Sequence, residues 1–388
     1  MYVGSLDGKT KNRLLRVGTS SLYIPPGHPL FVDGDTMMAQ AFDAERLAVS
    51  GQPVLVAEHV GQNTPGLSAV AASPQGTIAY AGTLIVNGRL TWFDRGGNPL
   101  DPAGPEGDYV DFRLSPDDRF LAASQVDPKA GTVDIWMSDL ARSSTSRFSS
   151  GGRPIASPAW SRNGARLVYR INRNGAGNQF VRRSAGGGGP EELVLTFEAE
   201  RAAQIRGGNI VPTDWSPDGE NILFLVTAPD SLNDLWILPL GGDKKPYKFL
   251  ATPAEEMHGN FSPDGHFVAY TSNESGRFEV YVETFPRSDR KWPVSTNGGY
   301  EPRWRADGRE IYYLSENRKL MAVSVGAGPS FGVPVTLFQT RVPTGITANR
   351  THYVPSRDGK RFLVNTQSGD PSPNPITVVL NWQAGLKK

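Results

Sequence analysis

The chain has 388 residues, of which 43 are glycine and 31 are proline. Long helices tolerate neither residue in their interior, so this composition excludes helical bundles and coiled coils and favours short strands joined by turns. The 40 basic and 39 acidic side chains leave a formal net charge of +1, which implies no nucleic-acid partner. The sequence contains no cysteine, which excludes disulfides, thiolate metal sites and thiol nucleophiles.

A turn-forming tetrapeptide recurs along the chain. Its eight copies are PPGH from Pro25, SPQG from Ser73, SPDD from Ser115, SRNG from Ser161, SPDG from Ser216, SPDG from Ser262, RADG from Arg305 and SRDG from Ser356. Successive starts are 42 to 55 residues apart, a spacing that fits four short strands and their turns. Proline fixes φ, aspartate binds the local backbone and glycine accepts a positive φ, so each copy is predicted to close a hairpin.

Each repeat is predicted to hold four strands. An inner strand ends at the tetrapeptide, a β-rich run such as 221–227 follows it, and a third run carries a central aromatic residue such as Trp236. A short fourth strand completes the unit. Repeats are expected to start near residues 21, 69, 109, 155, 210, 257, 300 and 351.

The two ends of the chain are predicted to complete each other. The last repeat has three strands, including the run 376–382, and residues 1–20 contain two short segments that could close the ring. The sequence therefore predicts an all-β protein: a single β-propeller domain over 1–388 with four-stranded antiparallel blades. Eight blades are expected, or seven if the first, degenerate unit is not a blade.

The repeated W-S-P-D-G hairpin, followed by an aromatic strand, resembles the repeats of TolB-like (PD-type, WD-like) propellers. More narrowly, YVGSLDGKTKNRLL, TMMAQAFDAERLAVSGQPV and ITVVLNWQAGLKK resemble the extracytoplasmic sensor region of acidobacterial-type serine/threonine kinases. Those relatives carry a membrane span and a kinase domain upstream, which this chain lacks. The resemblance implies a non-catalytic sensing or binding propeller and names no ligand. Since the chain as given has no signal peptide and no apolar run of membrane-spanning length, its localisation stays open.

Candidate functional residues are expected at the positions where the inner strands of the repeats differ from one another. Strand A is innermost in a propeller, so equivalent positions form rings around the axial channel. Four residues before each tetrapeptide stand Ser21, Ala69, Asp111, Ser157, Pro212, His258, Glu301 and His352. Two residues before it stand Tyr23, Ala71, Arg113, Ala159, Asp214, Asn260, Arg303 and Val354. The channel candidates for ligand binding are Asp111, Arg113, Asp214, His258, Asn260, Glu301, Arg303 and His352.

Imidazole and carboxylate groups that converge on a pore could hold a divalent metal ion, with His258, Glu301 and His352 as ligands. The alternative is that these side chains only hydrogen-bond to channel water. The G-x-S-x-G pattern at 328–332 is assigned to a loop, because no strand-to-helix turn follows it.

Three functions stay open from the sequence. The first is a sensor-type binding propeller for an unknown small molecule, peptide or protein. The second is a hydrolase of esters, phosphotriesters or lactones that works in the channel, with a divalent metal ion as its possible cofactor. The third is a protein-interaction platform that uses the arginine-rich segment 170–183. A monomer is expected, and a catalytic residue is not assigned.

Overall fold

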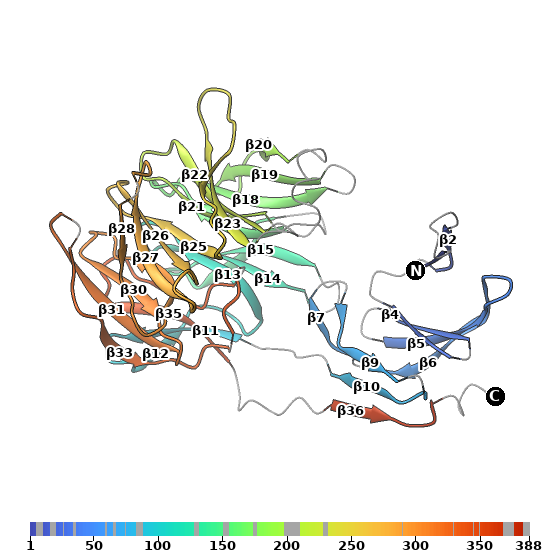
Figure 1. The fold of residues 1–388 in the computed structure, drawn as a ribbon. Coiled ribbons are helices and arrows are strands. Elements are labelled where there is room, and N and C mark those ends of the chain that lie inside the picture. The colour runs from blue at the N-terminus through green and yellow to red at the C-terminus, as the bar shows by residue number, and fades with distance from the viewer. Residues whose placement is uncertain are drawn as a thin grey trace. The chain divides into compact units, whose positions relative to one another are not determined.

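The computed structural model describes residues 1–4, 11–15, 21–25, 27–33, 36–58, 60–64, 67–73, 75–82, 88–127, 132–149, 155–173, 177–197, 210–227, 232–288, 290–328, 330–343, 345–348, 350–367 and 376–382. They form antiparallel sheets, which confirms the all-β prediction (Figure 1). Within these ranges, no helix is long and apolar enough to cross a membrane. Contacts divide the chain into unit 1 (Met1–Val86, Pro128–Gly131 and Gly369–Lys388) and unit 2 (Asn87–Asp127 and Thr132–Ser368).

Unit 2 contains six sheets, which we number as blades 1 to 6. Blade 1 holds β13 (Asp108–Leu114), β14 (Phe120–Val126), β15 (Val133–Asp139) and β16 (Ser144–Arg147). Blade 2 holds β17 (Ile155–Trp160), β18 (Arg166–Arg173), β19 (Gly177–Ser184) and β20 (Glu192–Thr196). Blade 3 holds β21 (Ile210–Trp215), β22 (Asn221–Thr227), β23 (Asn233–Pro239) and β24 (Tyr247–Leu250). Blade 4 holds β25 (Glu256–Phe261), β26 (Phe267–Ser272), β27 (Glu279–Thr284) and β28 (Lys291–Pro293). Blade 5 holds β29 (Tyr300–Trp304), β30 (Glu310–Leu314), β31 (Lys319–Gly326) and β33 (Val335–Gln339), and the short strand β32 (Ser330–Phe331) also pairs with β31. Blade 6 holds β34 (Tyr353–Pro355), β35 (Arg361–Gln367), β11 (Gly88–Asp94) and β12 (Pro99–Pro102).

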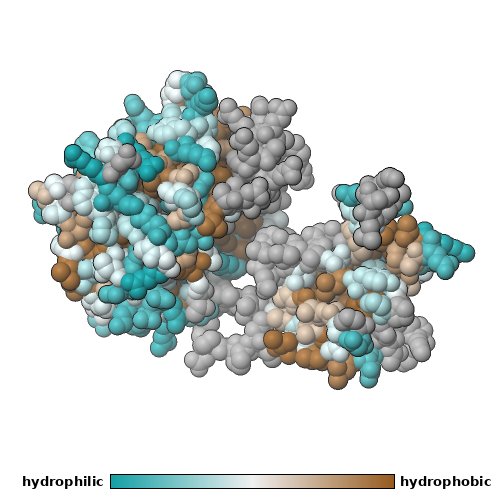
Figure 2. Space-filling model, viewed as in Figure 1, coloured by the Kyte–Doolittle hydropathy of each residue, from teal (hydrophilic) through white to brown (hydrophobic). Residues whose placement is uncertain are grey.

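The six blades close into a ring. Six apolar clusters are found in unit 2, and each one joins a blade to the next: blades 1 and 2, 2 and 3, 3 and 4, 4 and 5, 5 and 6, and 6 and 1. Inner and middle strands are buried because a blade covers each of their faces, as for β22, whereas the outermost strands β12 and β16 are exposed throughout. On the face shown in Figure 2, unit 2 carries mainly hydrophilic and intermediate residues with scattered apolar ones.

Unit 1 contains one four-stranded sheet and three smaller ones. The four-stranded sheet holds β3 (Ser21–Ile24), β4 (His28–Asp33), β5 (Thr36–Asp43) and β6 (Ala48–Ala57). A three-stranded sheet holds β9 (Val70–Ala72), β10 (Ile78–Ala81) and β36 (Ile376–Val379). Two further pairs are β1 (Tyr2–Gly4) with β2 (Lys11–Arg13) and β7 (Gln62–Thr64) with β8 (Leu67–Ser68). One apolar cluster, which includes Met37 and Trp382, forms its core.

The eight predicted repeats are present as sheets, but two of them exchange a strand. Repeats 2 and 8 were each expected to supply their own third strand. Instead β11 of repeat 2 pairs with β35 of repeat 8 over seven residues, and β36 of repeat 8 pairs with β10 of repeat 2. The exchange buries Leu90 and Trp92 in the cluster between blades 6 and 1.

Blade number and ring closure therefore differ from the prediction. In the described residues, unit 2 holds six blades, where eight or seven were expected; repeat 1 and the first two strands of repeat 2, β9 and β10, lie in unit 1. The ring closes through residues 88–102 rather than 1–20: β1 pairs with β2, and β2 is exposed along its length and offers no apolar face to a blade. One domain over 1–388 stays a prediction for the whole chain, which the structure describes as two units.

The tetrapeptide forms the expected turn after each inner strand of unit 2. At Ser216, the hydroxyl contacts Asp218 and accepts a hydrogen bond from Asn221 N at 2.8 Å, while Asp218 accepts one from Glu220 N at 2.9 Å. Gly219 has a φ of 80°, and Gly359 at the same position has a φ of 67°. A glycine is favoured there because L side chains are strained in this region.

We expect alanine to cost more at Gly359 than at Gly219. At Gly219 a Cβ would meet nothing within 4 Å, so only backbone strain of about 1–2 kcal/mol is added. At Gly359 it would lie 2.1 Å from Tyr312 Oη, and Tyr312 is buried and held by Glu310 at 2.7 Å. Urea unfolding should show a loss about twofold larger for Gly359→Ala, or more. Equal losses would contradict this packing argument.

Candidate functional site

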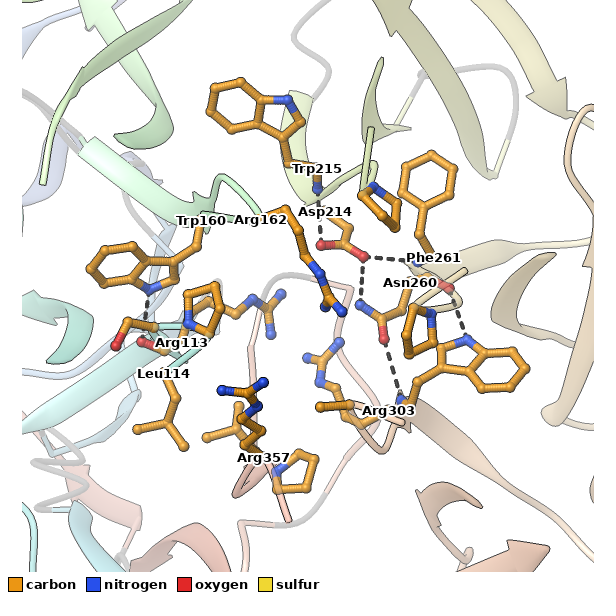
Figure 3. A pocket seen from close by; sticks show the side chains of 18 of the residues that line it. Arg113, Leu114, Trp160, Arg162, Asp214, Trp215, Asn260, Phe261, Arg303 and Arg357 are labelled. Atoms are coloured by element: carbon orange, nitrogen blue, oxygen red, sulfur yellow. Dashed lines mark hydrogen bonds between the residues drawn. The ribbon is translucent and has the colours of Figure 1, made fainter. Parts of the chain in front are cut away.

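A pocket of about 210 Å³ opens at the inner strands of unit 2 (Figure 3). Every blade contributes the residue two positions before its tetrapeptide: Arg113, Ala159, Asp214, Asn260, Arg303 and Val354. Every blade also contributes the second residue of the tetrapeptide: Pro116, Arg162, Pro217, Pro263, Ala306 and Arg357. The pocket therefore lies on the axis of the ring, where equivalent positions of all six blades meet.

β-Bulges direct these side chains. The register between the two innermost strands shifts once in each of blades 1 to 5, at the position four residues before the tetrapeptide or next to it. Ser157, His258 and Glu301 occupy that position with φ values of 59°, 57° and 54°. A bulge adds one residue to a strand and so changes which side chains point inward. Strain of this kind marks positions that the surrounding structure must hold in place.

The eight sequence candidates separate into two groups. Arg113, Asp214, Asn260 and Arg303 line the pocket. Asp111, His258, Glu301 and His352 are buried and do not line it. The sequence alignment placed both groups around the axis, but only the structure shows that one group faces the cavity and the other is packed between blades.

The buried group links blades 4, 5 and 6. His352 Nδ1 lies 2.6 Å from Glu301 Oε1, and His352 N donates to Glu301 Oε2 at 3.0 Å. Thr271 Oγ1 accepts from Glu301 N at 3.1 Å and lies 3.3 Å from His258 Nδ1. His258 Nε2 donates to Thr347 O at 3.0 Å. The polar groups of these side chains hydrogen-bond within this network, and the network stabilises the contact between the blades.

Burial sets the protonation of this group. Burial lowers the pKa of His258 to about 4, against a smaller opposite influence of Glu301, so the imidazole is neutral at pH 7. Burial alone would raise the pKa of Glu301, but the charge and hydrogen bond of His352 outweigh it and lower the pKa to about 2. Among the described residues, no group of three or more His, Asp or Glu side chains is arranged to hold a metal ion. His258 and Glu301 both contact Thr271 Oγ1, and His352 contacts Glu301, so the three predicted ligands form a chain of hydrogen bonds.

Thr351 connects the two inner arginines, a role that the sequence did not reveal. Its hydroxyl donates to Asp111 Oδ1 at 2.6 Å and accepts from Arg113 Nη1 at 3.0 Å and Arg303 Nη2 at 3.3 Å. Arg113 also lies 3.6 Å from Asp111. The two guanidinium groups come from blades 1 and 5, line the pocket and donate to the same hydroxyl.

Asp214 is the acidic residue among the unit 2 positions that lie two residues before a tetrapeptide, and backbone and amide groups surround it. It accepts hydrogen bonds from Trp215 N at 2.9 Å and from Phe261 N and Asn260 Nδ2, both at 2.8 Å. Asn260 Oδ1 in turn accepts from Trp304 N at 3.4 Å. Asp214 and Asn260 therefore tie blades 3, 4 and 5 together at the pocket wall.

Arg162 and Arg357 were missed as site residues. Both stand where most repeats have proline, and both are exposed at the pocket mouth. The signal was present in the sequence, since SRNG and SRDG depart from S-P-D-G at the second residue. The other predicted arginine cluster belongs to blade 2: Arg182 forms an ion pair with Glu192 at 2.8 Å, and Arg183 donates to Phe148 O at 2.8 Å.

A closed ring of four-stranded antiparallel sheets around an axial pocket defines a β-propeller, and its fold is TolB-like. A Tol-Pal system protein TolB of Francisella tularensis is 26% identical over 179 residues, 44% of this chain and 38% of the relative. The chain thus spans under two fifths of the length of the curated relatives it matches. No family model matches the chain.

Two solved structures share the fold. A protein assigned as TolB in Agrobacterium tumefaciens has a TM-score of 0.57 at 13% identity, over 73% of this chain and 99% of that one. An oligogalacturonate lyase in complex with manganese has a TM-score of 0.51 at 14% identity, over 80% of this chain and 94% of that one. Because these neighbours include both TolB and an enzyme, the fold leaves the function to be argued from the site. The relationship to kinase sensor regions stays a prediction.

Proposed function

We propose that the protein is a non-catalytic, sensor-type binding propeller whose ligand occupies the axial pocket of unit 2. One observation carries the proposal: the polar residues that vary between repeats meet in this pocket, while the His and Glu side chains that hydrolysis would need are buried beside it. Among the described lining residues there is neither histidine nor glutamate. Asp214, the inner-ring carboxylate, already accepts three hydrogen bonds.

The proposal includes a small molecule, peptide or protein as partner, a monomeric chain and an extracytoplasmic place of action. The likeness to TolB proteins supports a binding role, and the resemblance of the sequence to sensor regions favours it over a hydrolase. A hydrolase of esters, phosphotriesters or lactones is the alternative, and it requires a general base with access to the pocket.

A variant that fills the pocket tests the proposal. Ala306 is half-buried on the pocket wall, so Ala306→Trp should block the cavity and leave the fold intact; Ala141→Trp, at an exposed site on blade 1, is the matched control. In a thermal-shift screen of organic acids, sugars, nucleotides and peptides, ligands should raise the Tm of the parent and the control and leave Ala306→Trp unchanged.

Hydrolysis assays complete this test. Ester, phosphotriester and lactone substrates should show no turnover above the buffer rate. Turnover that Ala306→Trp abolishes would contradict the non-catalytic proposal and favour the alternative. Ligands that bind Ala306→Trp as well as the parent would move the binding site away from the pocket.

A further inference from the structure

Four guanidinium groups converge on the axial pocket (Figure 3). Arg113 and Arg303 come from the inner strands β13 and β29, and Arg162 and Arg357 come from the turns that follow β17 and β34. Arginines at the centre and at the mouth thus face one cavity from four different blades. No side-chain hydrogen bond or ion pair is found for Arg162 or Arg357 within the part of the chain that the structure describes.

Positive side chains outnumber carboxylates in the described lining of the pocket. Only two carboxylates, Asp118 and Asp214, are found among the described lining residues. Asp214 accepts hydrogen bonds from two backbone N–H groups and from the side-chain amide of Asn260. Asp118 accepts a hydrogen bond from the backbone N of Arg357 at 2.7 Å. Four arginines and two carboxylates give the described lining two more positive than negative charges. Asp111, which does not line the pocket, lies 3.6 Å from Arg113 and offsets part of this excess.

Arg303 points to the same conclusion independently. It is 6% exposed, and its Nε has no hydrogen-bond partner. Buried polar atoms are nearly always paired, so an unpaired donor on a buried guanidinium indicates a group that a ligand completes. Burial, followed by the charge of Arg113, lowers the pKa of Arg303 to about 10, and the opposite charges of Glu301 and Asp111 offset this lowering only in part.

We infer that the axial pocket binds the carboxylate groups of an acidic ligand that carries two or more of them. Guanidinium forks bind carboxylates with two parallel hydrogen bonds, and four forks around one cavity can hold more than one such group. The volume of about 210 Å³ is below the roughly 300–1,000 Å³ of pockets for drug-sized ligands, so a compact polycarboxylate fits better than a large molecule. The inference rests on the proposed function and adds the chemical class of the ligand.

The same chemistry has two sources, a free organic acid and an acidic peptide segment, and the probes separate them. We would titrate tricarballylate, the peptide Ac-Glu-Glu-Glu-NH2 and inorganic phosphate, with tricarballylamide and Ac-Gln-Gln-Gln-NH2 as neutral counterparts. Trp160, Trp215 and Trp304 line the pocket and provide a fluorescence signal. Binding of tricarballylate alone identifies a free acid as the source, and binding of the glutamate peptide alone identifies an acidic segment; either result supports the inference.

The test variant is Arg162→Gln with Arg357→Gln, since both side chains are exposed and their loss leaves the core untouched. The control is Arg142→Gln with Arg309→Gln, whose side chains are 74% and 79% exposed and lie outside the pocket. Affinity for the carboxylate probe should fall at least tenfold in the test variant and stay unchanged in the control. Arg303→Lys, which keeps the charge but loses the fork, should also weaken binding several-fold.

Three results would overturn the inference: equal binding of the neutral amides, binding of phosphate alone, or unchanged affinity in the test variant. If neutral ligands bind the pocket and Ala306→Trp blocks them while neither acid binds, the proposed function stands and this inference fails. If no ligand of any kind depends on the open pocket, both fail.

Discussion

Glu301→Ala is expected to lower the free energy of unfolding of unit 2 by about 2–6 kcal/mol, because it leaves two buried polar groups of His352 without partners, each at a cost of about 1–3 kcal/mol. The Glu301 and His352 side chains are 1% and 2% exposed, and water cannot replace the lost carboxylate. The substitution leaves His352 N and Nδ1 without their acceptors, which lie at 3.0 and 2.6 Å. The contact between blades 5 and 6 would then contain an uncompensated polar group.

Urea unfolding followed by tryptophan fluorescence measures this loss. Glu316→Ala is the matched control, since Glu316 is exposed on the same blade, and it should change stability by less than about 0.5 kcal/mol. Glu301→Gln keeps an acceptor oxygen for His352 and should lose less than alanine does. If Glu301→Ala were as stable as Glu316→Ala, the pair would not hold the two blades together.

The second large effect is a loss of stability in mild acid that depends on His258. Because burial lowers the pKa of His258 from 6.5 in the unfolded chain to about 4 in the fold, only the unfolded chain binds this proton between those values. Protonation therefore favours unfolding, and stability falls as the pH drops from about 6.5 to 4, by up to about 1.4 kcal/mol for each pH unit. Above pH 6.5 both states are neutral and the effect vanishes.

His258→Asn tests the assignment. Asparagine tolerates the positive φ of 57° at this position and does not titrate, so the variant should lose part of the slope of stability against pH between 6.5 and 4. His266→Asn is the control, since His266 is exposed, and it should keep the slope of the parent protein. The same slope in all three proteins would show that other groups cause the acid sensitivity.

Glu301 makes stability depend on pH in a second, lower pH range. Its pKa is about 2 in the fold and 4.5 in the unfolded chain, so its contribution is complete above 4.5 and is lost as the pH falls towards 2. The two groups act in the same direction in successive pH ranges. A two-step decline of stability is expected below pH 6.5, and only its upper step should depend on His258.

Local chemistry made much of the fold predictable. The turn residues, the β-rich runs and the repeat length depend on short stretches of chain, so the sequence alone indicated four-stranded antiparallel blades and the positions where repeats begin. It also indicated the inner-ring residues Arg113, Asp214, Asn260 and Arg303, because equivalent positions of a propeller must meet at its axis.

Strand exchange was not predictable in this way. The runs 88–94 and 376–379 both have the pattern of a third strand, and pattern alone assigns each one to its own repeat. The choice depends on long-range pairing: β11 places Leu90 and Trp92 in the cluster between blades 6 and 1 and thereby completes a ring of six. Blade number follows from that pairing, which no local signal encodes.

The direction of the inner side chains was also decided by the tertiary structure. A one-residue bulge determines whether a position faces the channel or a neighbouring blade, and it turned His258 and Glu301 away from the pocket although both lie on the inner strands. Arg162 and Arg357 face the pocket because the turns of blades 2 and 6 end at its mouth. The sequence by itself determined what each repeat is made of; only packing between blades decided which side chains meet, because that depends on contacts between residues far apart in the chain.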